Sequence, residues 1–200
     1  MDKELGGVGM RTLYHITTAL VLLMLHCEGL SAQRTSNGTS ALSLTAGTTL
    51  SGLGGEIAYS RYLTSACWMA GTAFNDRVER DVPSGELVHY PRWDIRGGFS
   101  YRLLATYSRS LNLYAGGDAF IGLEMLDLFR TLTPPTAQAY ANAGYNDICF
   151  IYGAAPVLET ELFLTPRLAL ILRGRMPLTF GTPFPLIGWE VGAGLKLNFQ

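Results

Sequence analysis

Apolar and polar side chains alternate along most of the chain after residue 40. The last residues show the pattern most clearly, because Leu195, Leu197 and Phe199 alternate with Lys196 and Asn198. A period of two places successive side chains on opposite faces of a β-strand. Segments with this period lie at 41–51, 54–63, 66–78, 92–104, 110–124, 147–163, 166–177 and 186–199. The pattern therefore predicts an all-β fold with eight strands, and no stretch of residues 33–200 has a helical period.

The predicted strands and their connections have the proportions of a membrane barrel. Most strands span about 9 to 15 residues, which is longer than the ~5 to 6 usual in globular sheets. Connections at 64–65, 105–110 and 165–166 are tight, whereas those at 75–91 and 125–146 are long and that at 178–186 is intermediate. The first connection, 51–55, is short where this alternation expects a long one. Short turns at one end and longer loops at the other are typical of outer-membrane barrels.

The two faces of the predicted strands differ in character. One face carries bulky apolar side chains such as Leu170, Leu195 and Leu197. The other carries charge and is rich in glycine, with Gly98, Gly116, Gly122, Gly192 and Gly194. Eight strands enclose only enough space for side chains, which favours small residues and compensated charges inside. We therefore predict an eight-stranded antiparallel outer-membrane-type β-barrel with its apolar face toward lipid.

The C-terminal strand is expected to close this barrel. A closed barrel has no free edge, so the last strand is expected to pair with the first. The stretch GLKLNF (194–199) also resembles the C-terminal signal of outer-membrane barrels.

Three residues depart from the scheme. Ile171 falls on the inward face between charges, and Arg61 falls on the outward face, where it requires a position near the headgroups. Pro156 lies within a predicted strand and removes a ladder hydrogen bond, which predicts a β-bulge.

Composition agrees with a membrane barrel and gives no sign of nucleic-acid binding. Hydrophobic residues make up 48% of the chain and charged residues 16%, while the formal net charge is -1. Lys196 is the only lysine in residues 33–200, against twelve arginines. Arginine suits paired, partly buried sites because its planar fork binds carboxylates bidentately. An arginine-preferring genome explains the bias equally well.

The N-terminus reads as an export signal. Arg11 precedes the apolar run 16–25, and small residues at 29–33 allow cleavage after Ala32. We therefore predict a signal peptide at 1–32, with Met10 as a possible true start, and a transmembrane barrel domain at 33–200. Of the cysteines outside the signal, Cys67 and Cys149 are interpreted as small buried hydrophobes rather than a disulfide.

The sequence offers little for catalysis. His89 is the only histidine of residues 33–200 and has no recognisable nucleophile or base beside it in sequence. No metal-binding, nucleotide-binding or protease motif occurs. We therefore predict no enzymatic activity, no metal and no cofactor.

Charges on the predicted inward face suggest a barrel-interior charge network, formed by Glu159, Glu161, Arg173, Arg175 and Glu190. These residues allow two interpretations, an ion path or a salt-bridged plug that fills a narrow barrel. The plug is favoured because an unpaired charge there costs several kcal/mol, of order 3 to 5.

The loop at 125–146 is long and partly apolar. Phe129, Tyr140 and Tyr145 form a possible docking surface, and they fit equally well a loop folded over the barrel mouth.

Four stretches carry a family resemblance: DIRGGFSYRLL (94–104), LNLYAGGDAFIGLEML (111–126), IYGAAPVLETELFLTPRLALILRGRMPLTFG (151–181) and WEVGAGLKLNF (189–199). In these stretches the chain resembles the TraO family of conjugative transposon proteins, which are Bacteroides-type conjugal transfer proteins. The resemblance covers roughly residues 41–199.

The resemblance implies a structural or docking component of a conjugative, type IV secretion-like DNA transfer apparatus at the outer membrane. Its implied partners are other conjugal transfer proteins and outer-membrane lipid, with no direct nucleic-acid contact. The family offers no catalytic residue to assign here. Two alternatives remain, an outer-membrane lipid-modifying barrel enzyme and a soluble periplasmic ligand-binding barrel.

Overall fold

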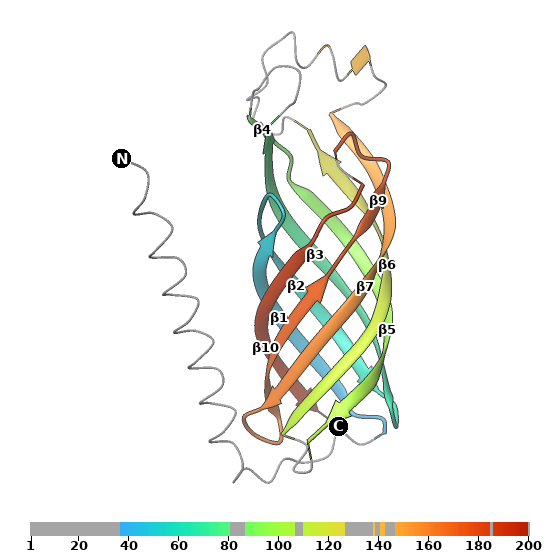
Figure 1. The fold of residues 1–200 in the computed structure, drawn as a ribbon, viewed down its shortest axis with the longest axis vertical. Coiled ribbons are helices and arrows are strands. Elements are labelled where there is room, and N and C mark those ends of the chain that lie inside the picture. Colours follow the sequence, from blue (N-terminus) through green and yellow to red (C-terminus); the bar gives the residue numbers. More distant parts are fainter. Residues whose placement is uncertain are drawn as a thin grey trace, which may run out of the picture.

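The computed structural model describes residues 37–80, 87–106, 110–126, 138, 141–142, 147–184 and 186–199. Most of these residues form one closed antiparallel barrel, shown in Figure 1. Its long strands are β1 (Ser40–Thr49), β2 (Gly52–Tyr62), β3 (Ala66–Arg80), β5 (Arg92–Ala105), β6 (Leu111–Met125), β7 (Ile148–Phe163), β8 (Leu168–Arg175) and β10 (Glu190–Phe199). Two short strands, β4 (Leu87–His89) and β9 (Leu178–Phe180), extend the wall beside β3 and β7.

Pairing of the last strand with the first closes the barrel. β1 pairs with β10 over its full length, from Ser40 opposite Phe199 to Thr49 opposite Glu190. β2 and β3 also pair, so the order runs without interruption around the wall. The predicted fold of eight antiparallel strands, including the pairing of the C-terminal strand, is confirmed.

The two ends of the barrel differ in their connections. At one end, here called the turn end, β2 joins β3 through 63–65, β5 joins β6 through 106–110, and β7 joins β8 through 164–167. The other end, here called the loop end, carries the longer segments 81–91, 126–147 and 176–189. It also holds the tight β1–β2 turn at Leu50 and Ser51, the short connection that departs from the alternation.

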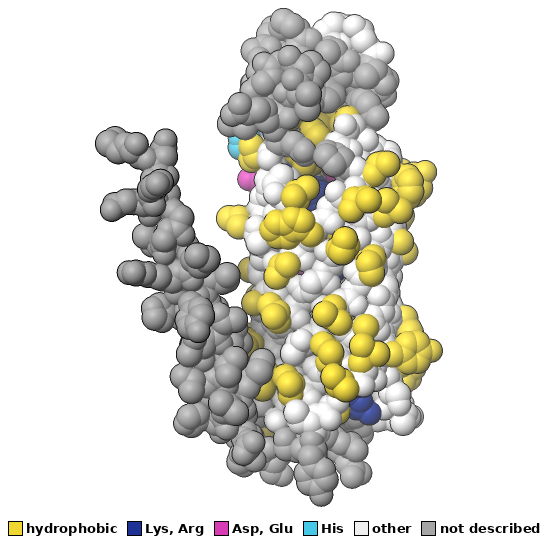
Figure 2. All heavy atoms as spheres, in the orientation of Figure 1, with side chains coloured by type: hydrophobic (Ala, Val, Ile, Leu, Met, Phe, Trp, Pro, Cys, Tyr) yellow, Lys and Arg dark blue, Asp and Glu magenta, His cyan; other side chains and the backbone are white. Residues whose placement is uncertain are grey.

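The orientation of the two faces follows the prediction. Leu195 and Leu197 are about half exposed, while Glu159 and Arg173 are buried inside. Figure 2 shows hydrophobic side chains spread over the described wall, with charged side chains mainly at its two ends. Ile171 is fully buried and Arg61 is exposed on the outward face, as expected.

The predicted bulge at Pro156 is wrong. β7 keeps a constant register with β6 through the proline, and the same register with β8 and β9 on its other side. The Pro156 carbonyl accepts a hydrogen bond from the Met176 amide (3.3 Å), so the proline nitrogen faces the gap between β8 and β9. Met176 lies opposite Pro156 in that gap, and the missing proline donor leaves the register on both sides unchanged. The register shift in the β5–β6 pair instead falls between Arg102 and Leu104.

Candidate functional site: the ion-paired barrel interior

Charged side chains from seven of the long strands fill the barrel. Among the described residues, six cationic and seven acidic side chains are buried, so the interior is close to neutral. They are Arg77, Arg92, Arg96, Arg173, Arg175 and Lys196 with Glu56, Asp94, Asp118, Glu124, Glu159, Glu161 and Glu190. Strand alternation turns all of them inward, and the strand register brings opposite charges together.

The group nearest the turn end is built around Lys196. Its ammonium Nζ donates to Glu161 at 2.6 Å and to Glu159 at 2.5 Å. The Tyr62 hydroxyl donates to the same Glu161, and the ammonium lies 5.6 Å from the centre of the Tyr62 ring. One cation therefore holds two carboxylates that neighbour each other on the inward face of β7.

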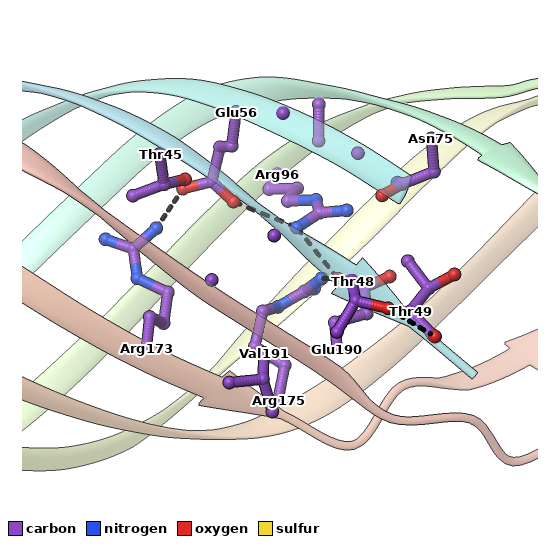
Figure 3. Close-up of a pocket in the computed structure, with 15 residues that line it drawn as sticks. Thr45, Thr48, Thr49, Glu56, Asn75, Arg96, Arg173, Arg175, Glu190 and Val191 are labelled. Atoms are coloured by element: carbon purple, nitrogen blue, oxygen red, sulfur yellow. Dashed lines mark hydrogen bonds and ion pairs between the residues drawn. The ribbon is translucent and has the colours of Figure 1, made fainter. Parts of the chain in front are cut away.

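The middle of the barrel is spanned by two guanidinium groups that share a carboxylate. Arg173 donates to Glu159 at 2.5 Å and also to Glu56 on the far side of the lumen. Arg96 donates to Glu56 at 2.9 Å and lies 3.1 Å from Glu190. Figure 3 shows Glu56 held between Arg173 and Arg96. These pairs tie β2 to β5 and β8 across the interior.

Toward the loop end, Arg175 has two acidic partners. Its Nε and Nη2 atoms donate to both Asp118 oxygens, at 2.8 and 2.5 Å, in a bidentate pair. Its Nη1 atom donates to Glu190 at 2.5 Å, and Arg77 reaches the same carboxylate at 3.0 Å. Bidentate guanidinium–carboxylate pairs are among the stronger and more directional hydrogen bonds in proteins.

A second branch runs toward the loop end through Asp94. This carboxylate accepts from Arg96 and from the Nε atom of Arg92, the latter at 2.9 Å. Arg92 also donates to the Thr179 hydroxyl at 3.2 Å and lies 4.0 Å from Glu124. The polar contacts thus form one continuous network along the barrel axis.

Apolar and aromatic clusters lie beyond both ends of this network. At the turn end, Tyr62 packs with Ala41, Cys67 and Tyr114. At the loop end, Tyr90, Leu126 and Cys149 form a second cluster. Phe184 stacks on Tyr90 with ring centroids 3.7 Å apart. Cys67 and Cys149 are both buried and are not joined in a disulfide, in agreement with their interpretation as small hydrophobes.

Little space remains between the charged side chains. The cavity drawn in Figure 3 has a volume of about 40 Å³, and a second one beside Cys67 and Glu159 has about 20 Å³. Such volumes hold one or a few water molecules, not a solute. Gly47 borders the larger cavity, opposite Gly54 on one side and Gly192 on the other. A Cβ atom on Gly47 would lie 2.1 Å from the backbone carbonyl oxygen of Val191, so a side chain there has no room.

The five residues predicted to form the charge network all lie in the interior, and each takes part in the contacts above. Sequence reasoning missed other members, namely Glu56, Arg77, Arg92, Asp94, Arg96, Asp118, Glu124 and Lys196. Alternation places several of these on the polar face, but it does not reveal which strands meet across the lumen.

The remaining candidate residues lie elsewhere. Phe129, Tyr140 and Tyr145 of the predicted docking loop fall outside the described residues, as does the predicted signal peptide. His89 ends β4 at the loop end, opposite Val78. Over the described part of the chain, no group of three or more His, Cys, Asp or Glu residues is arranged to hold a metal ion. Within that part, no helix has the length and apolar character needed to cross a bilayer.

These features define a class of protein: a closed eight-stranded barrel, apolar outside and ion-paired inside, has the architecture of small outer-membrane barrels. Neisserial surface protein A shares this fold, with a TM-score of 0.56, 12% identity, and coverage of 82% of this chain and 97% of that one. The N-terminal β-barrel domain of Pseudomonas aeruginosa OprF matches with a TM-score of 0.51, 10% identity, and coverage of 82% and 98%. At such identities the likeness establishes the fold alone.

The family follows from a separate comparison. The family model described as conjugative transposon protein TraO matches residues 39–199. The chain therefore belongs to the TraO family of conjugative transposon proteins, which confirms the resemblance found in its sequence. No curated protein matches the chain.

Proposed function

We propose that this chain is an outer-membrane barrel that serves as a structural or docking component of a conjugative DNA transfer apparatus. The outward face carries the membrane part of this proposal. Large apolar side chains are exposed on every long strand of the barrel, and Leu44, Ile57 and Leu195 are examples. Exposed apolar surface of this extent is unfavourable in water and suits a hydrocarbon environment.

Aromatic side chains at two levels of the wall support the same placement. Near the turn end, Tyr59 lies 5.5 Å from Trp68 and 6.4 Å from Phe199 between ring centroids. Toward the loop end, Tyr152 stacks on Phe180 at 5.6 Å. Aromatic girdles flank an apolar band of about 25 Å in outer-membrane barrels.

The spacing of the two levels is compatible with that band. On β5, the exposed rings Trp93 and Tyr101 are separated by about 26 Å along the strand, or about 20 Å along a barrel axis at a tilt near 40°.

The packed interior supports a structural role over a pore. The ion-pair network crosses the lumen, and the cavities within it are too small for a solute. A barrel of this kind acts through the surfaces that it presents at its two ends. In this proposal the signal peptide at 1–32 directs export, the turn end faces the periplasm, and the long loops face outward. Phe129, Tyr140 and Tyr145 supply the docking contacts.

The partners and the docking role are tested together in donor cells. A tagged full-length chain is purified from the outer-membrane fraction of a conjugating donor, and co-purifying proteins are identified by mass spectrometry. We expect other conjugal transfer proteins of the mating apparatus. A second strain carries a short Gly-Ser linker in place of residues 127–146, and we expect a folded barrel with lost partners and reduced mating.

The His89→Ala variant separates this role from a lipid-modifying enzyme. We expect unchanged lipid A composition and normal mating. A changed lipid profile favours the enzyme, and recovery of the chain in salt-washable periplasmic material favours a soluble ligand-binding barrel. Either result contradicts the proposed function.

A further inference from the structure

Charge is distributed unequally between the two ends of the barrel. The segments that join strands at the turn end, 63–65, 106–110 and 164–167, contain two arginines and no aspartate or glutamate. The loop-end segments 81–86, 90–91, 126–147 and 176–189 contain four acidic residues and one arginine. The compensated ion pairs of the interior do not explain this difference, because they lie between the two ends.

The structure places three arginines at the turn end. Arg61 and Arg167 are exposed, and Arg102 is partly exposed. Arg102 is held by its backbone amide, which donates to the Ser65 carbonyl at 2.9 Å, and by its guanidinium, which donates to the Thr64 carbonyl at 3.1 Å.

These arginines follow a continuous arc of the rim. The Arg167 carbonyl accepts from the Asn198 amide at 2.7 Å, which joins the β7–β8 turn to the end of β10. Phe199 pairs with Ser40, and Ser40 pairs with Arg61 on its other side. From Arg61 the chain runs through the turn at 63–65 that holds Arg102. We call Arg61, Arg102 and Arg167 the basic rim.

The position of Arg61 indicates what the basic rim contacts. Its side chain lies on the outward face, opposite Trp68 in the β2–β3 register. Trp68 belongs to the aromatic level near the turn end, and tryptophan and tyrosine concentrate at the depth of lipid headgroups. An arginine beside such a level extends its guanidinium to the phosphate layer while its methylene groups stay against apolar surface.

We propose that the basic rim binds the phosphate groups of anionic phospholipids in the leaflet next to the turn end. Guanidinium groups pair bidentately with phosphate oxygens, and each basic residue near an anionic surface favours binding by about fivefold. The rim thereby sets the depth of the barrel and enriches anionic lipid around its turn end. This inference rests on the proposed membrane location, but not on a role in conjugation.

The chain provides its own reporters for a test. Its three tryptophans include Trp68 near the basic rim and Trp93 toward the loop end. Two full-chain variants keep one tryptophan each, with the others replaced by phenylalanine. Each is reconstituted in phosphatidylcholine vesicles containing brominated phosphatidylglycerol or brominated phosphatidylcholine, and quenching gives the relative affinity for each lipid. Both reporters experience the same lipid mixture, so the orientation of the barrel does not matter.

We expect anionic lipid to be preferred by roughly fivefold at Trp68 and by less than about twofold at Trp93. In the Trp68 reporter, Arg61→Gln with Arg167→Gln should abolish the preference, whereas Arg61→Lys should retain most of it. Asp76→Asn at the loop end is the matched control and should leave it unchanged. Raised salt should weaken the preference.

Equal quenching of Trp68 by the two lipids, or a preference that survives the double glutamine variant, would overturn the basic rim as a phospholipid site. A third outcome would assign the basic rim to a protein partner. In that outcome the two lipids quench every variant equally, and an acidic protein that co-purifies with the wild-type chain from cells is lost from the Arg61→Gln/Arg167→Gln variant. Absence of quenching by either lipid would contradict the membrane location itself, which separates the two failures.

Discussion

The two faces of the barrel wall differ strongly in exposure and charge, although they are made from neighbouring residues. Glu56 is 6% exposed and the adjacent Ile57 is 52% exposed. Lys196 is 1% exposed and the adjacent Leu195 is 51% exposed. In a water-soluble barrel the charged member of each pair would face solvent. The surrounding solvent therefore decides which residues suit the apolar face, whereas the opposite charges within reach decide which residues suit the charged face.

This difference means that the two faces should respond to opposite kinds of substitution. The inner face tolerates a charge only where an opposite charge is within reach, because burial removes both from water. The outer face tolerates apolar residues of many shapes but not a charge at mid-membrane depth.

The largest effect is expected when an inner charge loses its partner. Arg173→Ala removes the cation between Glu56 and Glu159, and we expect the free energy of unfolding to fall by about 3 to 5 kcal/mol. Denaturant titration in lipid vesicles measures this loss, and the melting temperature in detergent should fall with it. Adding Glu159→Gln to Arg173→Ala should recover part of the loss, since it restores the net charge of the buried network.

The same variant also tests whether the interior is a plug. Wild type and Arg173→Ala should both give no single-channel currents in a planar bilayer, because Arg96, Arg175 and Lys196 still cross the lumen. A loss of stability below about 1 kcal/mol would show that these charges are not held as pairs. Clear wild-type currents would favour the ion path.

A charge placed on the outer face should have a slightly smaller effect. Ile57 lies midway along β2, and Ile57→Arg should cost about 2 to 4 kcal/mol in vesicles. Leu63→Arg, in the turn that directly follows β2, is the control and should cost no more than about 1 kcal/mol. Equal costs at the two sites would mean that position relative to the membrane has no influence.

A hydroxyl deletion examines the inner face without changing its charge. Tyr62→Phe keeps the ring against Tyr114 but removes the donor to Glu161, and we expect a loss of about 1.5 to 3 kcal/mol. Tyr59→Phe, whose hydroxyl meets the Ser40 hydroxyl at 2.7 Å at the partly exposed wall, should cost about 1 kcal/mol or less. Chemical unfolding of both variants in the same detergent decides between them, and a reversed order would contradict a buried Tyr62–Glu161 pair.

The smallest effect is expected at the basic rim. Arg61→Gln should change the free energy of unfolding by less than about 0.5 kcal/mol, because the side chain is exposed. A large loss of stability would mean that Arg61 has a structural role in the wall, and its lipid preference would then need a different explanation.

The alternation of side chains predicted the strands and their faces because a period of two is a local property of the chain. It did not predict which charges meet. Arg173 and Glu56 are 117 residues apart, and their contact depends on register and on reach across the lumen. Lys196 was placed on the polar face, yet its role between two carboxylates required the β8–β10 and β7–β8 registers.

The alternation of side chains also did not predict the two short strands or the effect of the proline. β4 and β9 have three residues each, too few to show a period. Pro156 was expected to distort its strand, since a proline lacks a donor. Its neighbours are not distorted, because the missing donor faces the interruption between β8 and β9, which no sequence pattern reveals.

The orientation of the two faces is tested most directly by the collision of spin labels with oxygen and with a water-soluble nickel complex. A nitroxide is attached to cysteine at position 57, 172 or 195, one at a time, with Cys67 and Cys149 replaced by alanine and the chain reconstituted in vesicles. We expect frequent collision with oxygen and little with nickel at all three positions, as for side chains in hydrocarbon. Frequent collision with nickel at these positions would place the apolar face in water and contradict the membrane-embedded barrel.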